Sequence, residues 1–284
     1  MKRILIQLDT DALPSVFDRV VAVDAGVDEL FSYGGVTPDN VTSLVHGAIF
    51  TRGPDDLKNT ALFIGGSNVE AGEALLKTIN KAFFGPMRVS VLMDSNGSNT
   101  TAAAAVKAAA RHLDLAKSTA VVFGGTGPVG HRAAQILASA GSQVRLVSRR
   151  QSKADEVCER IRAEVKDARV SGAELDAGPP KLLEGADLLI AAGAAGVQLL
   201  SSEEWKKAGQ LKVAIDLNAV PPVGLEGIKP GDKAKAQGDV VCYGAIGVGG
   251  LKMKIHRAAV QQLFEANDRV YDTATIYALA ESID

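Results

Sequence analysis

The stretch Ala120–Gly130 reads AVVFGGTGPVG, an apolar run that passes directly into a glycine-rich turn. Its first four residues favour a buried strand. The segment His131–Ala140 that follows has helical spacing, and Val144–Val147 predicts a second strand. Strand, glycine turn, helix and strand in this order are typical of a βαβ unit that binds a dinucleotide.

The three glycines of this turn have the spacing GxGxxG, at Gly125, Gly127 and Gly130. In such a unit the first makes the tight turn, the second lets a pyrophosphate approach the backbone, and the third allows close packing of the helix. The anion then lies at the helix N-terminus. We expect the whole turn to bind the cofactor: Gly125, Thr126, Gly127, Pro128, Val129 and Gly130.

The end of the second strand indicates which dinucleotide is bound. NAD-type sites carry an acidic residue there, which accepts hydrogen bonds from the ribose 2′-hydroxyl. This chain instead has Ser148-Arg149-Arg150, with Lys153 one turn further. Guanidinium groups bind phosphate in a bidentate manner, so the sequence predicts NADP. The alternative is that these cations form a solvated charge run.

Outward from this unit, short β-rich runs alternate with helical stretches. Ile4–Leu8, Thr60–Ile64 and Val89–Met93 predict strands of a first region, while Leu188–Ala192 and Val213–Leu217 continue the second. This alternation predicts an α/β fold with two domains, a central Rossmann-type parallel sheet and an N-terminal α/β domain that the C-terminal helix completes. The expected boundaries are 1–105 for the N-terminal domain, 106–264 for the NADP-binding domain, and 265–284 for the segment that packs back.

Composition narrows the class of protein. The 284 residues are 46% hydrophobic and 23% charged, which excludes a disordered chain. With 31 basic and 33 acidic residues the net charge is −2, so no basic excess exists to bind nucleic acid. Cys158 and Cys242 form no metal-ligand spacing, and we expect no metal. The apolar segment Leu188–Val197 is too short to span a membrane, and we expect a cytoplasmic protein.

No hydrolase or kinase motif occurs, and the four histidines form no nucleophile or metal constellation. Structural roles are the favoured interpretation of His112 and His131, which lie in predicted helices. The reaction is therefore expected to need little proton transfer.

Several longer motifs resemble those of one family over nearly the whole chain, namely the NADP-dependent methylene-tetrahydromethanopterin dehydrogenases of one-carbon metabolism. The segments that carry this resemblance are QLDTD (7–11), PSVFD (14–18), GVTPDNV (35–41), DSNGSNTT (94–101), NAVPPVG (218–224) and GAIGVGGLK (244–252). The resemblance implies hydride transfer from the methylene group of a reduced pterin to NADP. Some family members also accept methylene-tetrahydrofolate. Hydride loss from a carbon between two nitrogens leaves a resonance-stabilised amidinium cation, so no general base is required.

The resemblance places the family's active-site lysine at Lys252. We expect Lys252 to orient the pterin, while the alternative is an ordinary surface lysine at a helix start. Lys254, two positions along, faces elsewhere on a helix. A carboxylate is the natural partner of the amino-pyrimidinone edge of the pterin. The residues expected to bind substrate are Asp18, Asp94, Asn96, Ser98, Thr101 and Lys252. Each of these except the lysine has helix capping or a turn as its alternative role.

Further cofactor contacts are expected at the ends of later strands and at the glycine-rich segment before Lys252. These are Ala192, Gly193, Asn218 and Gly247. The resemblance also implies a homo-oligomer, a trimer or a hexamer. Two other functions remain open at this point: a tetrahydrofolate-specific dehydrogenase with a coupled cyclohydrolase, and a non-catalytic NADP sensor.

Overall fold

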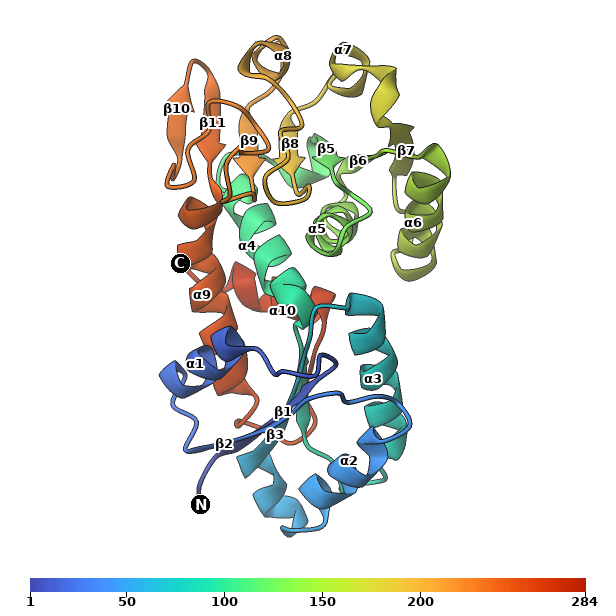
Figure 1. The fold of residues 1–284 in the computed structure, drawn as a ribbon, viewed down its shortest axis with the longest axis vertical. Coiled ribbons are helices and arrows are strands. Elements are labelled where there is room, and N and C mark those ends of the chain that lie inside the picture. Colours follow the sequence, from blue (N-terminus) through green and yellow to red (C-terminus); the bar gives the residue numbers. More distant parts are fainter. The chain divides into compact units, whose positions relative to one another are not determined.

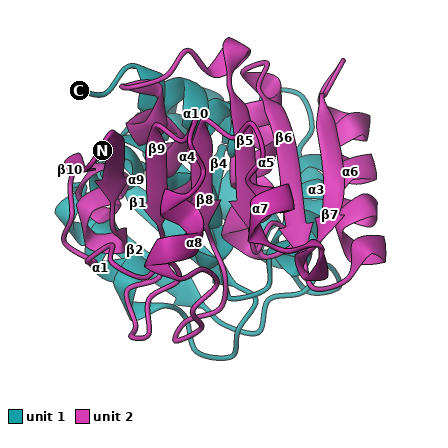
Figure 2. Cartoon of the chain, turned by 90° about the horizontal axis from the view of Figure 1, so that it is seen from above, with its two compact units in different colours: residues 1–100, 253–284 teal, residues 101–252 magenta.

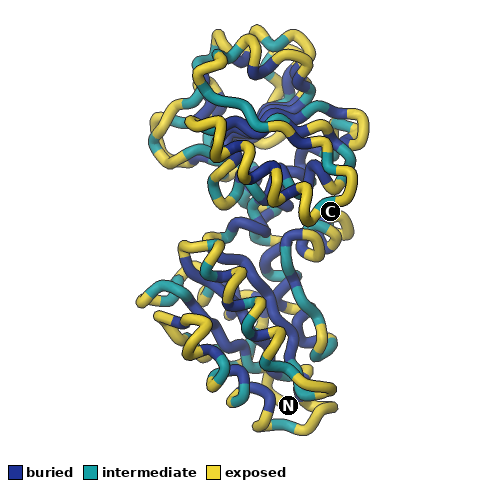
Figure 3. Tube along the Cα trace, turned by 90° about the vertical axis from the view of Figure 1, so that its right-hand side faces the viewer, coloured by how far each residue is buried: buried dark blue, intermediate teal, exposed yellow.

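A computed structural model describes all residues, 1–284, and divides the chain into two compact units (Figure 2). Unit 1 comprises Met1–Thr100 and Met253–Asp284, and unit 2 comprises Thr101–Lys252. The α/β class and the two-domain organisation are confirmed. In each unit the strands form the buried centre, dark blue in Figure 3.

Unit 1 is built on a parallel five-stranded sheet with the order β12-β4-β3-β1-β2. Its strands are β1 (Ile4–Asp9), β2 (Glu29–Tyr33), β3 (Thr60–Gly65), β4 (Ser90–Met93) and β12 (Val270–Tyr271). β12 comes from the end of the chain and pairs with β4, so the C-terminal segment adds a strand to this sheet. The sequence predicted the return of this segment as a helix, which α10 confirms, but not the strand. β2 is the edge strand next to β1.

Helices cover both faces of this sheet (Figure 1). They are α1 (Val16–Asp24), α2 (Val41–Ile49), α3 (Val69–Ala82) and α10 (Thr273–Glu281), together with the second half of α9 (Ala245–Gln262) and two 3-10 turns, η1 (Pro54–Asn59) and η2 (Ser95–Gly97). Leu75 and Ile79 of α3 pack with Val45 of α2 against Ile6 and Leu62, which lie on one face of the sheet. On the opposite face the ring of Phe63 stacks on a histidine of α9.

Unit 2 contains a seven-stranded sheet with the order β10-β11-β9-β8-β5-β6-β7. Its strands are β5 (Thr119–Phe123), β6 (Gln143–Ser148), β7 (Val170–Glu174), β8 (Leu188–Ala191), β9 (Val213–Asp216), β10 (Lys235–Gln237) and β11 (Val240–Tyr243). All pairs are parallel except β10 with β11. The chain runs from β5 to β6 on one side and later returns to β8 on the other side, so the order reverses between β5 and β8. Ligands of open parallel sheets bind beyond the carboxyl ends of the strands at such a point.

Unit 2 contains several helices, the longer of which pack on this sheet. They are α4 (Ser98–Ala110), α5 (Pro128–Ser139), α6 (Gln151–Glu164), α7 (Pro179–Leu182), α8 (Ser202–Lys206) and the start of α9, with the 3-10 turns η3 (Leu115–Lys117) and η4 (Leu175–Ala177). Trp205 is fully buried in the core between the sheet and these connections. No helix of either unit combines the length and hydropathy required to cross a bilayer.

The observed division of the chain differs from the expected boundaries in one respect. The first boundary falls at Thr100, close to the expected residue 105, whereas the second falls at Lys252 rather than at residue 264. The reason is that α9 is continuous from Ala245 to Gln262, and its second half packs on the sheet of unit 1. Unit 1 therefore receives more of the C-terminal chain than the sequence pattern indicates.

Candidate functional site

A cavity of about 490 Å³ lies in unit 2 where the strand order reverses. Its lining comes from the ends of β5, β6 and β8 and from the loops that follow them. Eight of the residues expected to bind the cofactor line it: Thr126, Gly127, Ser148, Arg149, Arg150, Lys153, Ala192 and Gly193. The position, the size and the loops of this cavity are those of a dinucleotide site.

The floor of the cavity is the turn between β5 and α5. Gly124 has a positive φ of 69°, and a Cβ atom there would lie 2.5 Å from the carbonyl oxygen of Ala192. Gly127 is the N-cap of α5, and no side chain caps this helix. The amide groups of its first turn are therefore available to an anion. A Cβ atom at Gly127 would lie 3.3 Å from the carbonyl oxygen of Gly124, which leaves little room for a side chain in this turn. The uncapped helix start and the side-chain-free turn fit a bound dinucleotide.

The other two glycines of the turn serve packing. A Cβ atom at Gly130 would lie 2.3 Å from the carbonyl oxygen of Gly124, and one at Gly125 would lie 2.4 Å from Cγ of Leu146. Both contacts are far below van der Waals distance, and the first is with backbone that cannot move away. The absence of side chains at these positions lets α5 lie against the turn.

Cations gather at one end of the cavity. Arg149 and Arg150 are exposed, and neither guanidinium makes an ion pair within the chain. Lys153 differs because its Nζ lies 2.6 Å from a carboxylate oxygen of Glu156. The side chain of Ser148 adds a hydroxyl, whose oxygen accepts a hydrogen bond from the backbone of Arg150. Guanidinium and hydroxyl groups are those that bind phosphate, and the binding of a 2′-phosphate by these residues stays a prediction.

The remaining expected cofactor residues do not line the cavity. Pro128 and Val129 lie in the first turn of α5, and Gly125 and Gly130 pack as described. Asn218 is buried and holds its own loop, since its Oδ1 accepts from the Val220 amide at 2.9 Å. A Cβ atom at Gly247 would lie 1.9 Å from the carbonyl oxygen of Asp232, so this glycine is explained by close backbone packing. Contact of Asn218 or Gly247 with the cofactor stays a prediction.

Sequence analysis missed five further residues of the same cavity, four of them apolar. Beyond β8 and β7 the wall is formed by Leu175, Ala194, Val197, Gln198 and Leu199. The small residues after β8 gave a partial signal, because Ala192 and Gly193 were expected there. No signal in the local sequence indicated Leu175, because this residue reaches the cavity only through the pairing of β7 with β6.

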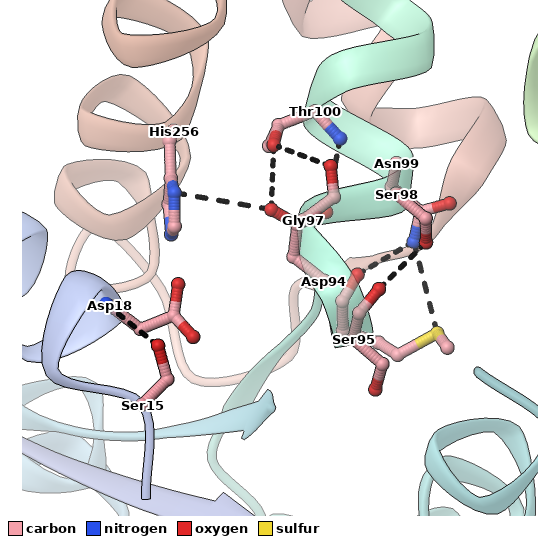
Figure 4. A network of polar contacts seen from close by, with 10 residues as sticks. Ser15, Asp18, Asp94, Ser95, Gly97, Ser98, Asn99, Thr100 and His256 are labelled. Carbon is pink, nitrogen blue, oxygen red and sulfur yellow. Dashed lines mark hydrogen bonds and ion pairs between the residues drawn. The ribbon is translucent and has the colours of Figure 1, made fainter. Parts of the chain in front are cut away.

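In unit 1 a polar segment follows β4 at the carboxyl edge of the sheet (Figure 4). Asp94 is fully buried, and its carboxylate accepts hydrogen bonds from Thr100, from the amide at 3.0 Å and from the hydroxyl at 2.6 Å. Oδ2 of Asp94 also lies 3.9 Å from Nδ1 of His256. Asp94 thus anchors the start of α4, which is the capping alternative considered from the sequence.

His256 joins two segments that are distant in the sequence. It lies on α9, is 1% exposed, and stacks on Phe63 of β3 with ring centroids 5.6 Å apart. Its Nδ1 points toward Asp94 (Figure 4). Sequence analysis gave it no role, because nothing in the local pattern indicates its contact with the loop after β4.

The three other residues of this polar segment have different surroundings. Ser98 is buried and its Oγ donates to the carbonyl oxygen of Ser95 at 2.8 Å. Asn96 is exposed and has a positive φ of 56°, a conformation that asparagine tolerates better than most residues. Thr101 is partly exposed and lies one turn after Ser98 on α4.

Asp18 and Lys252 complete the expected substrate residues, and Lys254 is compared with them. Asp18 is partly exposed on the first turn of α1, where Ser15 accepts a hydrogen bond from its amide at 3.3 Å. Figure 4 shows its side chain directed toward the side of α9 that carries His256. Lys252 is 9% exposed and lies one helical turn before His256 on α9. Lys254 is exposed, and its Nζ donates to the carbonyl oxygen of Asp284 at 2.9 Å.

Comparison with known protein families divides the chain in the same way. Residues 16–96 match the family profile "Methylene-tetrahydromethanopterin dehydrogenase, N-terminal", and residues 112–222 match "Putative NAD(P)-binding". A protein of Methylorubrum extorquens named "Bifunctional protein MdtA" is 45% identical over 99% of both chains. The "NAD(P)-dependent methylenetetrahydromethanopterin dehydrogenase" of the same organism is 35% identical and covers 95% of this chain and 94% of its own.

Solved structures similar to this chain show the fold alone. Quinate dehydrogenase from Corynebacterium glutamicum, solved with NAD, has a TM-score of 0.55 at 12% identity and covers 99% of both chains. Ornithine carbamoyltransferase from Pyrococcus furiosus has a TM-score of 0.56 at 12% identity, with 92% of this chain and 83% of its own covered. These structural similarities support the two-domain α/β architecture, but at such low identity they indicate no particular substrate.

Proposed function

Since this chain belongs to the methylene-tetrahydromethanopterin dehydrogenase family, we propose that it transfers a hydride from the methylene group of methylene-tetrahydromethanopterin to NADP⁺. The products are the methenyl form of the pterin, a cation, and NADPH. The carbon loses a hydrogen with both bonding electrons and no proton is released, so the reaction needs no base. The observation that carries the proposal is the cavity at the β5–β8 reversal, in a chain 45% identical to a relative over nearly its full length.

The residues of unit 2 would hold NADP, which supplies the hydride acceptor when bound. The uncapped start of α5 would bind the pyrophosphate, and Arg149 with Arg150 would bind the 2′-phosphate. Ser148 would add a hydrogen bond. Lys153 contributes less, because Glu156 already neutralises much of its charge.

The pterin would be bound by residues of the two segments at which the units meet in the sequence, together with α1. Asp18 is partly exposed, and its carboxylate suits the amino-pyrimidinone edge of the pterin. Asn96, Thr101 and Lys252 would provide further polar contacts. Asp94 and Ser98 are buried and would act by holding the start of α4 in place.

Lys252 would orient the ring system, because a cation beside a forming cation does not stabilise it electrostatically. Rate would then depend on alignment of the methylene carbon with the nicotinamide at near-attack distance. Methanopterin and folate carriers share the ring that reacts, so we propose methylene-tetrahydrofolate as a second substrate for the same residues.

The exchange Lys252→Ala tests this function against Lys254→Ala as its matched control. We expect kcat/KM to fall by about a hundredfold in the first variant, on the order of 2–3 kcal/mol of transition-state stabilisation. The control keeps the same helix and the same net charge change, and it should retain wild-type kinetics because Lys254 bonds only to Asp284. Equal kinetics in both variants, with intact NADP binding, would remove Lys252 from the site.

Three expectations about the setting of the enzyme accompany this reaction. We infer from the family that it works in the cytoplasm as a homo-oligomer, with no nucleic acid as partner. Its net charge of −2 agrees with the last point.

A further inference from the structure

A carboxylate is buried at the end of β1, within the segment QLDTD (7–11). Asp9 is 0% exposed, and neither of its carboxylate oxygens forms an ion pair. Burial of a charge without a cation is unfavourable unless hydrogen-bond donors take the place of water. The function of Asp9 is therefore indicated by the groups that donate to it.

All the donors to the Asp9 carboxylate are amide groups. Its Oδ1 accepts from the backbone amide of Asp11 at 2.9 Å, and its Oδ2 accepts from the backbone amide of Ser15 at 3.0 Å. The side-chain amide of Gln7 donates to Oδ2 at 3.4 Å. The hydroxyl of Ser32 on β2 donates to Oε1 of Gln7 at 2.9 Å, which fixes the orientation of that amide. Asp9 thus attaches the loop that follows β1 to the end of the strand.

The same loop is attached to the chain beyond both neighbouring strands. After β2, the amide of Gly35 donates to the carbonyl oxygen of Asp11 at 2.7 Å. After β3, Ser67 donates to the carboxylate of Asp11 from its amide at 3.0 Å and from its hydroxyl at 2.9 Å. Gly65 leaves room for the buried carboxylate, since a Cβ atom there would lie 2.9 Å from Oδ2 of Asp9. The sheet therefore determines the position of this loop.

Ser15 connects the loop to α1. Its backbone amide donates to Asp9, and its Oγ caps the helix by accepting from the amide of Asp18 at 3.3 Å (Figure 4). α1 has nine residues and buries only Val21 and Ala22, so its own packing holds its first turn weakly. The attachment at its N-terminus therefore determines where the Asp18 carboxylate lies.

We propose that Asp9 is a positioning residue for the reaction: through Ser15 it fixes Asp18 for contact with the amino-pyrimidinone edge of the pterin. This inference rests on the proposed function, which assigns Asp18 to that contact. Asp9 itself is fully buried and does not touch the substrate. An asparagine would not serve, because its NH₂ group would face a backbone amide at a place where the carboxylate presents an oxygen.

Calorimetric titration of the full chain with tetrahydromethanopterin tests this role without requiring turnover. Asp9→Asn should raise the Kd for the pterin about tenfold, because a backbone amide of the loop loses its charged acceptor. The Kd for NADP should stay within about twofold of wild type, since the exchange lies in unit 1 and the cofactor cavity in unit 2.

The matched control is Asp28→Asn, the same exchange at the other end of the same strands. The Asp28 carboxylate accepts from the backbone amide of Arg3 at 2.7 Å, just before β1 begins. Because the amino ends of parallel strands lie at the edge of the sheet opposite to the proposed site, this variant should keep the wild-type Kd for the pterin.

A pair of exchanges at Ser15 leaves the buried carboxylate intact. Ser15→Ala removes the helix cap and should raise the Kd for the pterin about fivefold. Ser15→Thr keeps the hydroxyl and should return the Kd to within about twofold of wild type. A Kd that rises equally in both variants would overturn the proposed route through Ser15.

A double-mutant cycle separates positioning from a structural role alone. If Asp9 acts through Asp18, then Asp9→Asn should leave the Kd for the pterin unchanged in a chain that already carries Asp18→Ala. Ser15→Ala enters the same cycle, so the test does not depend on the folding of a chain with an altered buried carboxylate. A wild-type Kd in Asp9→Asn, or an equal effect of either exchange with and without Asp18, would overturn the proposal.

The remaining outcomes distinguish this inference from the reaction itself. If Asp18→Ala alone leaves the Kd for the pterin unchanged, the positioning role fails, whereas NADPH formation from methylene-tetrahydromethanopterin would still support the dehydrogenase. If the pterin binds and its Kd responds to these exchanges as expected, but no NADPH forms, the positioning role stands and the proposed reaction fails.

Discussion

Replacing the arginines at the end of β6 should change which dinucleotide the protein prefers. Arg149 and Arg150 line the cofactor cavity and have no ion pair within the chain, so their full charge is available to a 2′-phosphate. A hydrogen bond to a charged group contributes about 1.5–3 kcal/mol. Because both side chains are exposed, we expect the lower end of this range for each of them.

At that magnitude, Arg149→Ala should weaken NADP binding about tenfold, and the double exchange with Arg150→Ala about a hundredfold. NAD affinity should stay within about twofold of wild type, because NAD has an uncharged 2′-hydroxyl where NADP has a phosphate. Lys153→Ala is the matched control in the same cavity. It should weaken NADP binding by less than about threefold, since Glu156 lies 2.6 Å from the Lys153 ammonium.

The assay is titration of each variant with NADP and with NAD, followed by intrinsic fluorescence or calorimetry at two salt concentrations. The difference in NADP affinity between wild type and the double variant should be smaller at high salt. The reason is that salt screens the attraction between the arginines and the phosphate, which only the wild type has. An unchanged ratio of NADP to NAD affinity in the double variant would refute the assignment of these arginines and, with it, the choice of NADP from the sequence.

Four further outcomes follow from glycine packing and thiol burial. Gly130→Ala should abolish NADP binding and cost at least 1–3 kcal/mol or so of stability, since its Cβ would meet Gly124 oxygen at 2.3 Å. Gly47→Ala has open space around its Cβ within α2 and should instead stabilise the fold by about 0.5–1 kcal/mol in denaturant titrations. Burial raises the pKa of both Cys158 and Cys242 to about 11, so Ellman's reagent at pH 8 should label neither until the chain is unfolded. The folded pKa values exceed the ordinary value of 9.0, so the neutral thiols favour the folded state. This contribution to the free energy of unfolding is present below pH 9 and is lost as pH rises toward 11.

The parts of the fold that are determined by residues close together in the sequence could be predicted. The unit from β5 to β6 was predicted closely because an apolar run, a glycine turn and a helical pattern follow one another without interruption. The sequence of residues 68–83 has apolar residues at helical spacing, and α3 is observed over Val69–Ala82. In contrast, β2 and α2 were missed. β2 is a half-exposed edge strand of five residues without clear alternation, and α2 is a short helix that contains serine, threonine and glycine.

The candidate site shows the same division. The eight cofactor residues that line the cavity were predictable, because they follow strand ends in one continuous βαβ arrangement. The role of Asp94 was not settled by the sequence, since capping and ligand binding use the same carboxylate. The contact of Asp94 with His256 and the stacking of His256 on Phe63 depend on the return of α9 to the first sheet. That return is a property of the tertiary fold, which no local pattern contains.

The most direct test of the proposed reaction is to follow NADPH fluorescence after mixing the wild-type protein with NADP⁺ and methylene-tetrahydromethanopterin. One NADPH should form for each methylene group consumed, and the same protein with NAD⁺ should react more slowly. Tight NADP binding without NADPH formation from this pterin or from methylene-tetrahydrofolate would contradict the assignment as a dehydrogenase and would leave a protein that only senses NADP.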